Sequence, residues 1–440
     1  MFLLGESREH PMHVGGLQLF TPPEGAGPEF LSELYRDMLS HNEFSPTFRK
    51  RPATVLGGIA PLAWTYDDDV DIEYHLRRSA LPTPGRVREL LELTSRLHTS
   101  LLDRHRPLWE TYLVEGLRDG RFAVYSKFHH ALIDGVSGLR LAIRTLSEDP
   151  ELTDIRVPWD LPSRRRSGTS SAAGSALAVA GAALGLAPSA FRVARAALME
   201  QELTRTFSAP RTMFNVKIGG ARRVAAQSWS LDRIKAIKQA AGVTVNDVVL
   251  AMCAGALRAY LSEQDALPEA PLVAMVPVSL RAESDADAGG NQVGAILCSL
   301  ATDVADPAVR LGAIAESMRG NKKVFAGLSK TESMALSALL MSPVAFATVP
   351  GFIAATPPPF NIVISNVPGP RAPMYWKGAR LEGNYPMSIA LDGLALNITL
   401  VNNAGNLDFG LVGCRHSVPH LQRLLTHLED SLAALEHAVR

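Results

Sequence analysis

Two adjacent histidines followed by an aspartate and a glycine have the clearest capacity for acid–base chemistry in this sequence. They stand in the segment HHALIDG, which contains His129, His130, Asp134 and Gly135. An imidazole with an ordinary pKa of about 6.5 can remove a proton from a hydroxyl group at neutral pH. A base held in position contributes about 10² to 10⁴ in rate. The segment therefore indicates a site where a histidine activates an alcohol.

The position of the pair decides which ring can act. The pair follows a predicted strand over residues 121–128 and precedes a short predicted helix that starts after Gly138 and ends at Ile143. Neighbouring residues of a strand point to opposite faces, so a single histidine enters a given cleft. Asp134 lies in a turn that Gly135 lets reverse, where its carboxylate can orient a ring or fix the loop through an arginine.

Two other interpretations of the pair stay open at this point. Both histidines can be structural residues satisfied by backbone groups. Alternatively, His129, His130 and Asp134 can bind a metal, although their spacing is not that of a helical HExxH site. A covalent mechanism is disfavoured because the chain has no GxSxG segment and its cysteines lie far from the histidines. Direct base-assisted attack is the mechanism that the residues favour.

The elements that must hold this site alternate between strand and helix along both halves of the chain. We expect strands over 13–20, 110–117, 121–128, 224–230, 272–278, 360–364, 393–401 and 407–412. We expect longer helices over 30–39, 87–102, 231–241, 243–261 and 307–320, the last with Asp306 as N-cap, and a C-terminal helix with a leucine stripe over 421–435. The pattern predicts an α/β fold with domains over 1–160 and 215–440. A linker and helix over 161–214 would join them.

Two long stretches carry no charged residue. Residues 172–191, inside the linker, are mostly small and are interrupted by Pro188, which favours a packed or surface helix over a membrane span. Residues 333–370 fit two interpretations, a buried helix leading into a buried strand or an apolar wall that faces lipid. Both interpretations of the second stretch stay open.

Composition excludes some classes of protein. Hydrophobic residues make up 47% of the 440 residues and charged residues 20%, the balance of a chain that buries a large core. Lys plus Arg and Asp plus Glu both number 44, and this balance argues against nucleic acid as a partner. Cysteines without a CxxC pair argue against a disulfide scaffold. Because no basic leader opens the sequence, we expect a cytoplasmic location, with peripheral attachment to the inner membrane or lipid inclusions as an option.

Six segments carry a resemblance to known proteins. HHALIDG matches the HHxxxDG signature of the CoA-dependent acyltransferase superfamily, which includes the condensation domains of peptide synthetases. The other five resemble the bacterial wax ester synthase/acyl-CoA:diacylglycerol acyltransferase family: PMHVGG (11–16), LDRHRPLWE (102–110), TVNDV (244–248), VPVSLR (276–281) and SNVPGP (365–370). The segments run in order over nearly the whole chain, which makes the resemblance specific.

The resemblance implies a fold, a reaction and roles for four residues. It implies two chloramphenicol-acetyltransferase-like domains with the active-site channel between them. His130 would deprotonate the acceptor alcohol, His129 and Asp134 would shape the site, and Gly135 would permit the turn. Acyl-CoA would be a co-substrate, with no permanently bound cofactor and no metal. The acceptor would be diacylglycerol or a long-chain alcohol.

Asn246 has both a local and a functional explanation. Thr244 followed three residues later by Asp247 resembles a capping box, so helix initiation explains much of this segment and makes Asp247 structural. The resemblance suggests a site role for Asn246, whose amide could stabilise an oxyanion. Losing one such donor typically costs about 2.7–4 kcal/mol of barrier.

Four further residues are candidates for the substrate channel. Pro107 and Trp109 have a plain structural explanation, a turn followed by packing of the indole. Asn366 and Pro368 belong to a turn after the strand expected over 360–364. Their place in the resembling segments, and the uncharged stretch beside the second pair, make them candidates.

Two alternative functions are compatible with the same residues. One is a standalone condensation-type acyltransferase that takes its acyl group from a carrier-protein thioester. The other is a non-catalytic protein of the lipid-droplet surface that retains the fold. The residues favour acyl transfer from coenzyme A over both.

Overall fold

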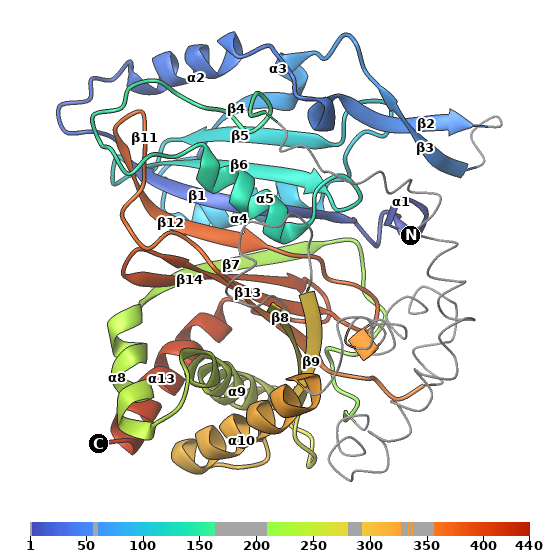
Figure 1. Ribbon diagram of the computed structural model, residues 1–440, viewed down its shortest axis with the longest axis vertical. Coiled ribbons are helices and arrows are strands. Elements are labelled where there is room, and N and C mark those ends of the chain that lie inside the picture. The colour runs from blue at the N-terminus through green and yellow to red at the C-terminus, as the bar shows by residue number, and fades with distance from the viewer. Residues whose placement is uncertain are drawn as a thin grey trace.

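The computed structural model describes residues 2–55, 60–162, 209–279, 293–326, 333, 336–337 and 356–440. Two six-stranded sheets lie one above the other in Figure 1, the first built mainly from the N-terminal half and the second from the C-terminal half. Short elements complete the N-terminal half: α1 (Phe2–Gly5), a 3₁₀ turn (Pro46–Arg49), the hairpin of β2 (Lys50–Val55) and β3 (Ala60–Tyr66), and α3 (Ile72–His75).

The first sheet has the strand order β11-β12-β1-β6-β5-β4. Its strands are β1 (His13–Thr21), β4 (Leu76–Ala80), β5 (Trp109–Glu115), β6 (Phe122–His129), β11 (Tyr375–Trp376) and β12 (Ala379–Met387). β1 pairs antiparallel with β6 on one side and with β12 on the other. Because β11 and β12 come from the C-terminal half, the first sheet is completed across the sequence.

Three helices cover the two faces of the first sheet, α2 (Phe30–Ser40), α4 (Val87–Thr99) and α5 (Gly135–Arg144). Alternate residues of β6 point to opposite faces. Phe128 lies on the face covered by α2 and α5, and Tyr125 lies on the face covered by α4. His129 therefore points to the α4 face, since it is four residues from Tyr125.

Helix α4 also packs against the second sheet. The backbone N–H of Val224 donates to Ser95 Oγ at 2.9 Å, and that of Arg222 donates to Thr99 Oγ1 at 3.0 Å. Val224 and Val412 of the second sheet share one buried cluster with residues of α4. This helix therefore lies between the two halves and fixes how they meet.

The second sheet has the strand order β7-β14-β13-β10-β8-β9. Its strands are β7 (Arg222–Ser230), β8 (Val273–Ser279), β9 (Val293–Ser299), β10 (Ile362–Val367), β13 (Leu396–Asn403) and β14 (Asn406–Cys414). The helices α8 (Leu231–Ala241), α9 (Val245–Glu263), α10 (Pro307–Ala326) and α13 (Arg423–Ala438) gather on the face turned away from the first sheet (Figure 1). This side holds the larger buried core.

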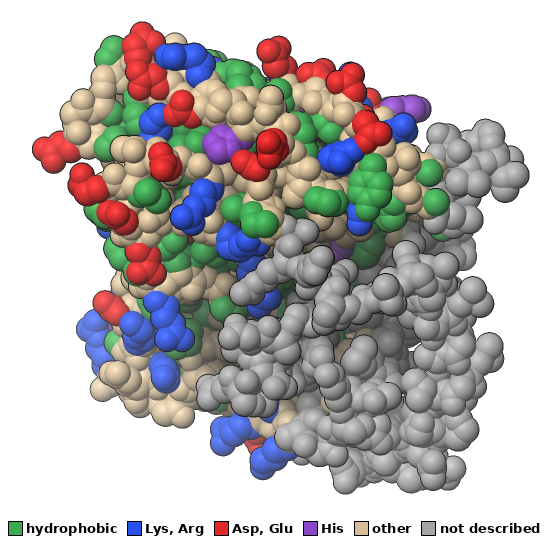
Figure 2. Space-filling view, turned by 45° about the horizontal axis from the view of Figure 1, so that its top comes forward, with side chains coloured by type: hydrophobic (Ala, Val, Ile, Leu, Met, Phe, Trp, Pro, Cys, Tyr) green, Lys and Arg blue, Asp and Glu red, His purple; other side chains and the backbone are tan. Residues whose placement is uncertain are grey.

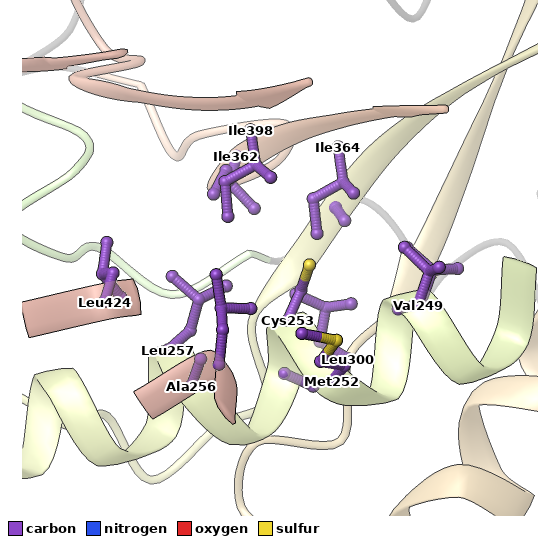
Figure 3. Close-up of a cluster of buried hydrophobic side chains, with 14 of the residues drawn as sticks. Val249, Met252, Cys253, Ala256, Leu257, Leu300, Ile362, Ile364, Ile398 and Leu424 are labelled. Carbon is purple, nitrogen blue, oxygen red and sulfur yellow. The ribbon is translucent and has the colours of Figure 1, made fainter. Parts of the chain in front are cut away.

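Helix α9 is the centre of that core. Figure 3 shows its side chains Val249, Cys253 and Leu257 facing Ile362 and Ile364 of the sheet. Within the described residues α9 is long and apolar enough to cross a membrane, but 67% of its apolar window is buried inside the fold. Its apolar character is explained by packing on both the sheet and α13.

Most elements expected from the sequence are confirmed in the described residues. The hairpin around residues 402–405 forms with Asn403 opposite Asn406, and Asp306 Oδ1 accepts from the N–H groups of Ala308 and Val309 at the start of α10. The expectation for the helix after the histidines was wrong at its start, as described below. The linker helix and the charge-free stretch over 172–191 lie outside the described residues, as does most of 333–355. The residue boundaries of the two domains stay a prediction.

The described surface mixes charges. In the space-filling view of Figure 2, acidic, basic and apolar side chains are interspersed over the part of this face that is coloured by type. That distribution agrees with the equal numbers of acidic and basic residues in the chain.

Candidate active site

The two motif histidines lie at the end of β6, beside the start of β1. His129 stands opposite His13 in the antiparallel register. The backbone N–H of His130 donates to the carbonyl of Met12 at 2.8 Å, one residue beyond the strand. The end of β6 is therefore held by the residues that lead into β1.

His129 is a fully buried structural ring. Its side chain has no exposed surface, and Nδ1 accepts a hydrogen bond of 3.1 Å from the N–H of Ala131. A backbone N–H can only donate, so Nδ1 carries no proton and the ring proton is on Nε2. Nε2 lies 3.5 Å from Glu6 Oε1. The ring is thus held in one tautomer and is shielded from any substrate.

His130 is the histidine that keeps an accessible surface. Its residue is half-buried, and its ring stacks on Phe2 with centroids 4.3 Å apart and an interplanar angle of 27°. Burial lowers the pKa of His130, and the charge of Asp134 offsets only part of that effect. The ring is therefore neutral at pH 7, the form that a general base requires.

Asp134 starts the helix that follows the motif. It is the N-cap of α5, and its carboxylate accepts from the N–H of Ser137 at 2.9 Å and from Ser137 Oγ at 2.8 Å. A serine, and not an arginine, therefore fixes the loop. The helix begins at Gly135, four residues earlier than expected, because this cap satisfies its first turn.

Gly135 is the first residue of α5 and does not adopt a positive φ. The expectation that its conformational freedom reverses the turn was wrong, because the chain enters α5 with ordinary helical geometry after the Asp134 cap. A Cβ on Gly135 would lie 3.9 Å from Val14 Cγ1 and would take up space beside β1. The absence of a side chain at Gly135 therefore leaves space between α5 and β1.

A cavity lies between α5 and the first sheet. Gly15, Gly16, Gly135 and Gly138 are among its lining residues, and its walls also include Phe128 and Leu139 on opposite sides. A Cβ on Gly16 would meet no atom within 4 Å, so this glycine leaves space open, whereas a Cβ on Gly15 would point to Tyr125 on the α4 face of the sheet. The cavity starts beside the motif and is largely apolar.

The other half of the chain reaches this region through the segment SNVPGP. Val367, at the end of β10, packs with Leu139 of α5 and with Val401 of β13. A Cβ on Gly369 would lie 1.9 Å from the carbonyl oxygen of Asn402, so this turn requires a glycine. The helix that follows the histidines thus contacts the second sheet directly.

The channel candidates occupy different environments. Trp109 is completely buried: its indole donates to the carbonyl of Phe48 at 3.0 Å and stacks on His75 and Trp159. Pro107 is buried beside it, and neither residue lines the cavity. These contacts account for both residues by packing.

Asn366 and Pro368 lie on either side of Val367 at the end of β10. Asn366 is half-buried on β10 opposite Leu400, and Pro368 is exposed just beyond the strand. They flank Val367, which contacts α5. The structure thus brings these two residues close to the helix of the motif, whereas Pro107 and Trp109 serve the core of the first half.

Asn246 and Asp247 lie in the first turn of α9. Asp247 Oδ2 accepts from the N–H of Thr244 at 2.9 Å and from Thr244 Oγ1 at 2.7 Å, which completes a capping box. Asp247 is therefore structural. Asn246 is half-buried, and among the described residues no hydrogen bond joins it to either motif histidine.

Three functional neighbours of the histidines escape sequence reasoning: Phe2, Glu6 and Arg104. The Glu6 side chain is 1% exposed and receives hydrogen bonds from Arg104 Nε at 3.1 Å and Nη2 at 3.0 Å. Burial opposes ionisation of this carboxyl, but the hydrogen bonds from His129, the Met12 N–H and Arg104 outweigh it and lower the pKa of Glu6. Glu6 and Arg104 are 98 positions apart in the sequence. Arg104 lies in the segment LDRHRPLWE, but no local pattern pairs it with Glu6.

A buried ion pair supports the strand behind His129. Lys127 is fully buried, and its Nζ lies 3.0 Å from Glu110 Oε2 and donates to the carbonyls of Leu97 and Ser100 at the end of α4. Glu110 is the acidic residue of the PLWE segment. That segment therefore contributes a charge to the framework of the site.

Comparisons with known proteins show which family the chain belongs to. The family model of the wax ester synthase/diacylglycerol acyltransferase catalytic domain matches residues 1–249, and that of the family's C-terminal domain matches residues 289–436. The chain is 68% identical over its full length, and over 98% of the relative, to a "probable diacyglycerol O-acyltransferase" (tgs2) of Mycobacterium tuberculosis.

Solved structures show the same fold. The wax ester synthase/diacylglycerol acyltransferase of Marinobacter aquaeolei matches with a TM-score of 0.80 and 44% identity, covering 100% of this chain and 97% of that one. The first condensation domain of the CDA synthetase matches with a TM-score of 0.56 at 17% identity, covering 97% and 91%, which shows the fold alone. The expected two-domain α/β fold is confirmed, and the chain belongs to the wax ester synthase/diacylglycerol acyltransferase family.

Proposed function

We propose that this acyltransferase moves a fatty acyl group from acyl-CoA to the hydroxyl of diacylglycerol or of a long-chain alcohol, with His130 as the general base. Family membership and the names of the relatives support the reaction class. The observation that carries the assignment of the base is the difference between the two rings. The His129 ring is fully buried and contacts the Ala131 N–H and the Glu6 carboxylate. His130 is only half-buried, and its pKa is lowered.

The proposed reaction proceeds in two steps. The neutral imidazole of His130 takes the proton of the acceptor hydroxyl as its oxygen attacks the thioester carbonyl, and a new C–O bond forms. The C–S bond then breaks, and the coenzyme A thiolate receives the proton from His130. The ring returns to its neutral form, and no residue of the chain is acylated.

The oxyanion of the tetrahedral intermediate needs a donor. We propose the side-chain amide of Asn246, which lies in the first turn of α9, where the helix dipole also favours negative charge. Acyl-CoA is proposed as a co-substrate that leaves with each turnover, with no permanently bound cofactor. The cavity between α5 and the first sheet, lined by Phe128 and Leu139, is proposed to accept the start of the acyl chain.

The decisive assay offers palmitoyl-CoA to the purified protein with diacylglycerol, with hexadecanol and with no acceptor. Triacylglycerol or a wax ester in the first two reactions supports the proposal, and the product identifies the acceptor. A protein that ignores palmitoyl-CoA but accepts an acylated carrier protein would instead be a condensation-type enzyme. A protein that forms no ester with either donor and binds lipid inclusions would be a non-catalytic surface protein.

A further inference from the structure

We infer that Glu6 is a positioning residue that holds both motif histidines in place. Its carboxylate touches His129 directly and reaches His130 through one backbone link. Glu6 lies outside every segment that carries the resemblance to the family. The inference rests on the proposed role of His130.

The direct contact fixes the ring of His129. Ala131 N–H donates to Nδ1 at 3.1 Å, which leaves the proton on Nε2, and Nε2 lies 3.5 Å from Glu6 Oε1. The ring is thus held between a backbone donor on one nitrogen and a carboxylate on the other. Without the carboxylate, the Nε2 proton would be buried with no charged partner, and the ring would lose one of its two anchors.

The backbone link fixes the start of the HHALIDG loop. The same oxygen, Glu6 Oε1, accepts from the N–H of Met12 at 3.2 Å, and the carbonyl of Met12 accepts from the N–H of His130 at 2.8 Å. Glu6 therefore holds the peptide against which the base is placed. A single carboxylate thus controls the ring of one histidine and the backbone of the next.

Arg104 holds the carboxylate itself. It donates to Glu6 Oε2 through Nε and Nη2, and its Nη2 also donates to the carbonyl of Leu3 at 2.9 Å. Leu3 lies in α1 beside Phe2, whose ring covers His130. Arg104, Glu6 and α1 therefore form one unit with the two histidines.

This unit matters because a base must be placed within a fraction of an ångström. A displacement of 1 Å at a reacting group can cost about 10²-fold in rate. Loss of the Glu6 carboxylate is therefore expected to lower kcat, because chemistry needs the position of His130. We expect little change in the binding of acyl-CoA, because the Glu6 side chain is 1% exposed.

The test compares Glu6→Ala, Glu6→Gln and Glu115→Ala in the full-length protein. Glu6→Ala should lower kcat about 10- to 100-fold and change the KM for palmitoyl-CoA less than threefold. Glu6→Gln keeps one oxygen that can accept from Met12 N–H, but its NH2 group would face the two donors of Arg104, so its kcat should lie between those of Glu6→Ala and the parent. Glu115 forms a similar pair with Arg78 at the opposite end of β5, and its loss should leave kcat unchanged.

A second measurement does not depend on the folding of Glu6→Ala. Nitrogen-15 NMR of labelled histidines in the unsubstituted protein should show the His129 ring with its proton on Nε2 between pH 6 and 8, assigned by loss of its signals in His129→Asn. A neutral ring with its proton on Nδ1 would overturn the inference. So would unchanged kcat in Glu6→Ala.

The outcomes also separate this inference from the proposed function. If His130 is not the base, His130→Ala retains turnover whatever Glu6 does. If the base assignment holds and Glu6 has no positioning role, His130→Ala is inactive and Glu6→Ala is as active as the parent.

Discussion

Leu139, on the helix that follows the histidines, packs against Val367 at the end of a strand of the second sheet. This contact joins two segments that stand more than two hundred residues apart in the sequence. It couples the loop that carries His130 to the other half of the protein, because α5 begins directly after that loop. The geometry of the site therefore depends on the interface between the halves.

Truncation of this contact should loosen the interface. Leu139→Ala removes a side chain that is 7% exposed, and a core change of this kind costs about 2–5 kcal/mol. We expect a lower Tm and a fall in kcat measured at a temperature where the variant is fully folded. The exposed Val309, on α10, gives a control in Val309→Ala. An unchanged Tm in Leu139→Ala would show that the contact contributes nothing.

Removal of the ring that covers His130 should shift the pH profile. Burial lowers the pKa of His130 below its ordinary value of 6.5, so the base loses activity only as pH falls through that lowered pKa. Phe2→Ala exposes the imidazole, which should raise its pKa toward 6.5 and move the acid limb of kcat/KM to higher pH. Profiles from pH 5 to 8 check this, with Tyr66→Ala, an exposed aromatic, as control. A shift to lower pH would contradict the account.

Removal of one partner of the buried Lys127–Glu110 ion pair should lower the free energy of unfolding. Lys127→Met leaves Glu110 buried with fewer partners, and loss of one partner of such a pair typically costs about 3–5 kcal/mol. The double variant Lys127→Met/Glu110→Gln should recover part of that loss, because it leaves no buried carboxylate, and Arg77, which also pairs with Glu110, is 35% exposed. Denaturant unfolding of the two variants measures the difference. Equal stability of the single variant and the parent would refute the prediction.

Substitutions of Thr244 and Asn246, both at the start of α9, should have different effects: the first on stability and the second on catalysis. Thr244→Ala removes the capping side chain and should cost about 1 kcal/mol of stability while leaving kcat unchanged. Asn246→Ala should leave the Tm unchanged and lower kcat about 10²- to 10³-fold if its amide holds the oxyanion. Measurements of Tm and kcat for both variants test these two expectations. Full activity in Asn246→Ala would remove this residue from the site.

Local patterns predicted the elements better than the site. The apolar spacing of α2 and α13 and the turn residues of the β13–β14 hairpin are local signals, and the structure confirms them. The start of α5 was misplaced because the cap by Asp134 outweighed the low helix propensity of Gly135 and Gly138. The return of β12 to the first sheet has no local signal, since pairing between residues far apart depends on tertiary packing.

The same limit applies to the candidate site. The histidines stand out because their types and spacing carry chemistry within seven residues. Glu6 and Arg104 do not, because each is an ordinary charged residue until the fold brings them together. Their contact with His129 arises from burial and ion pairing across the chain, which the sequence alone does not display.

The most direct test of the account is the turnover of His130→Ala with palmitoyl-CoA and the better acceptor, beside its Tm. We expect a loss of kcat of at least about 10²-fold, with a Tm close to that of the parent, because His130 is half-buried and its loss removes a base. Ester formation at the parental rate by the folded variant would contradict the assignment of His130 as the base.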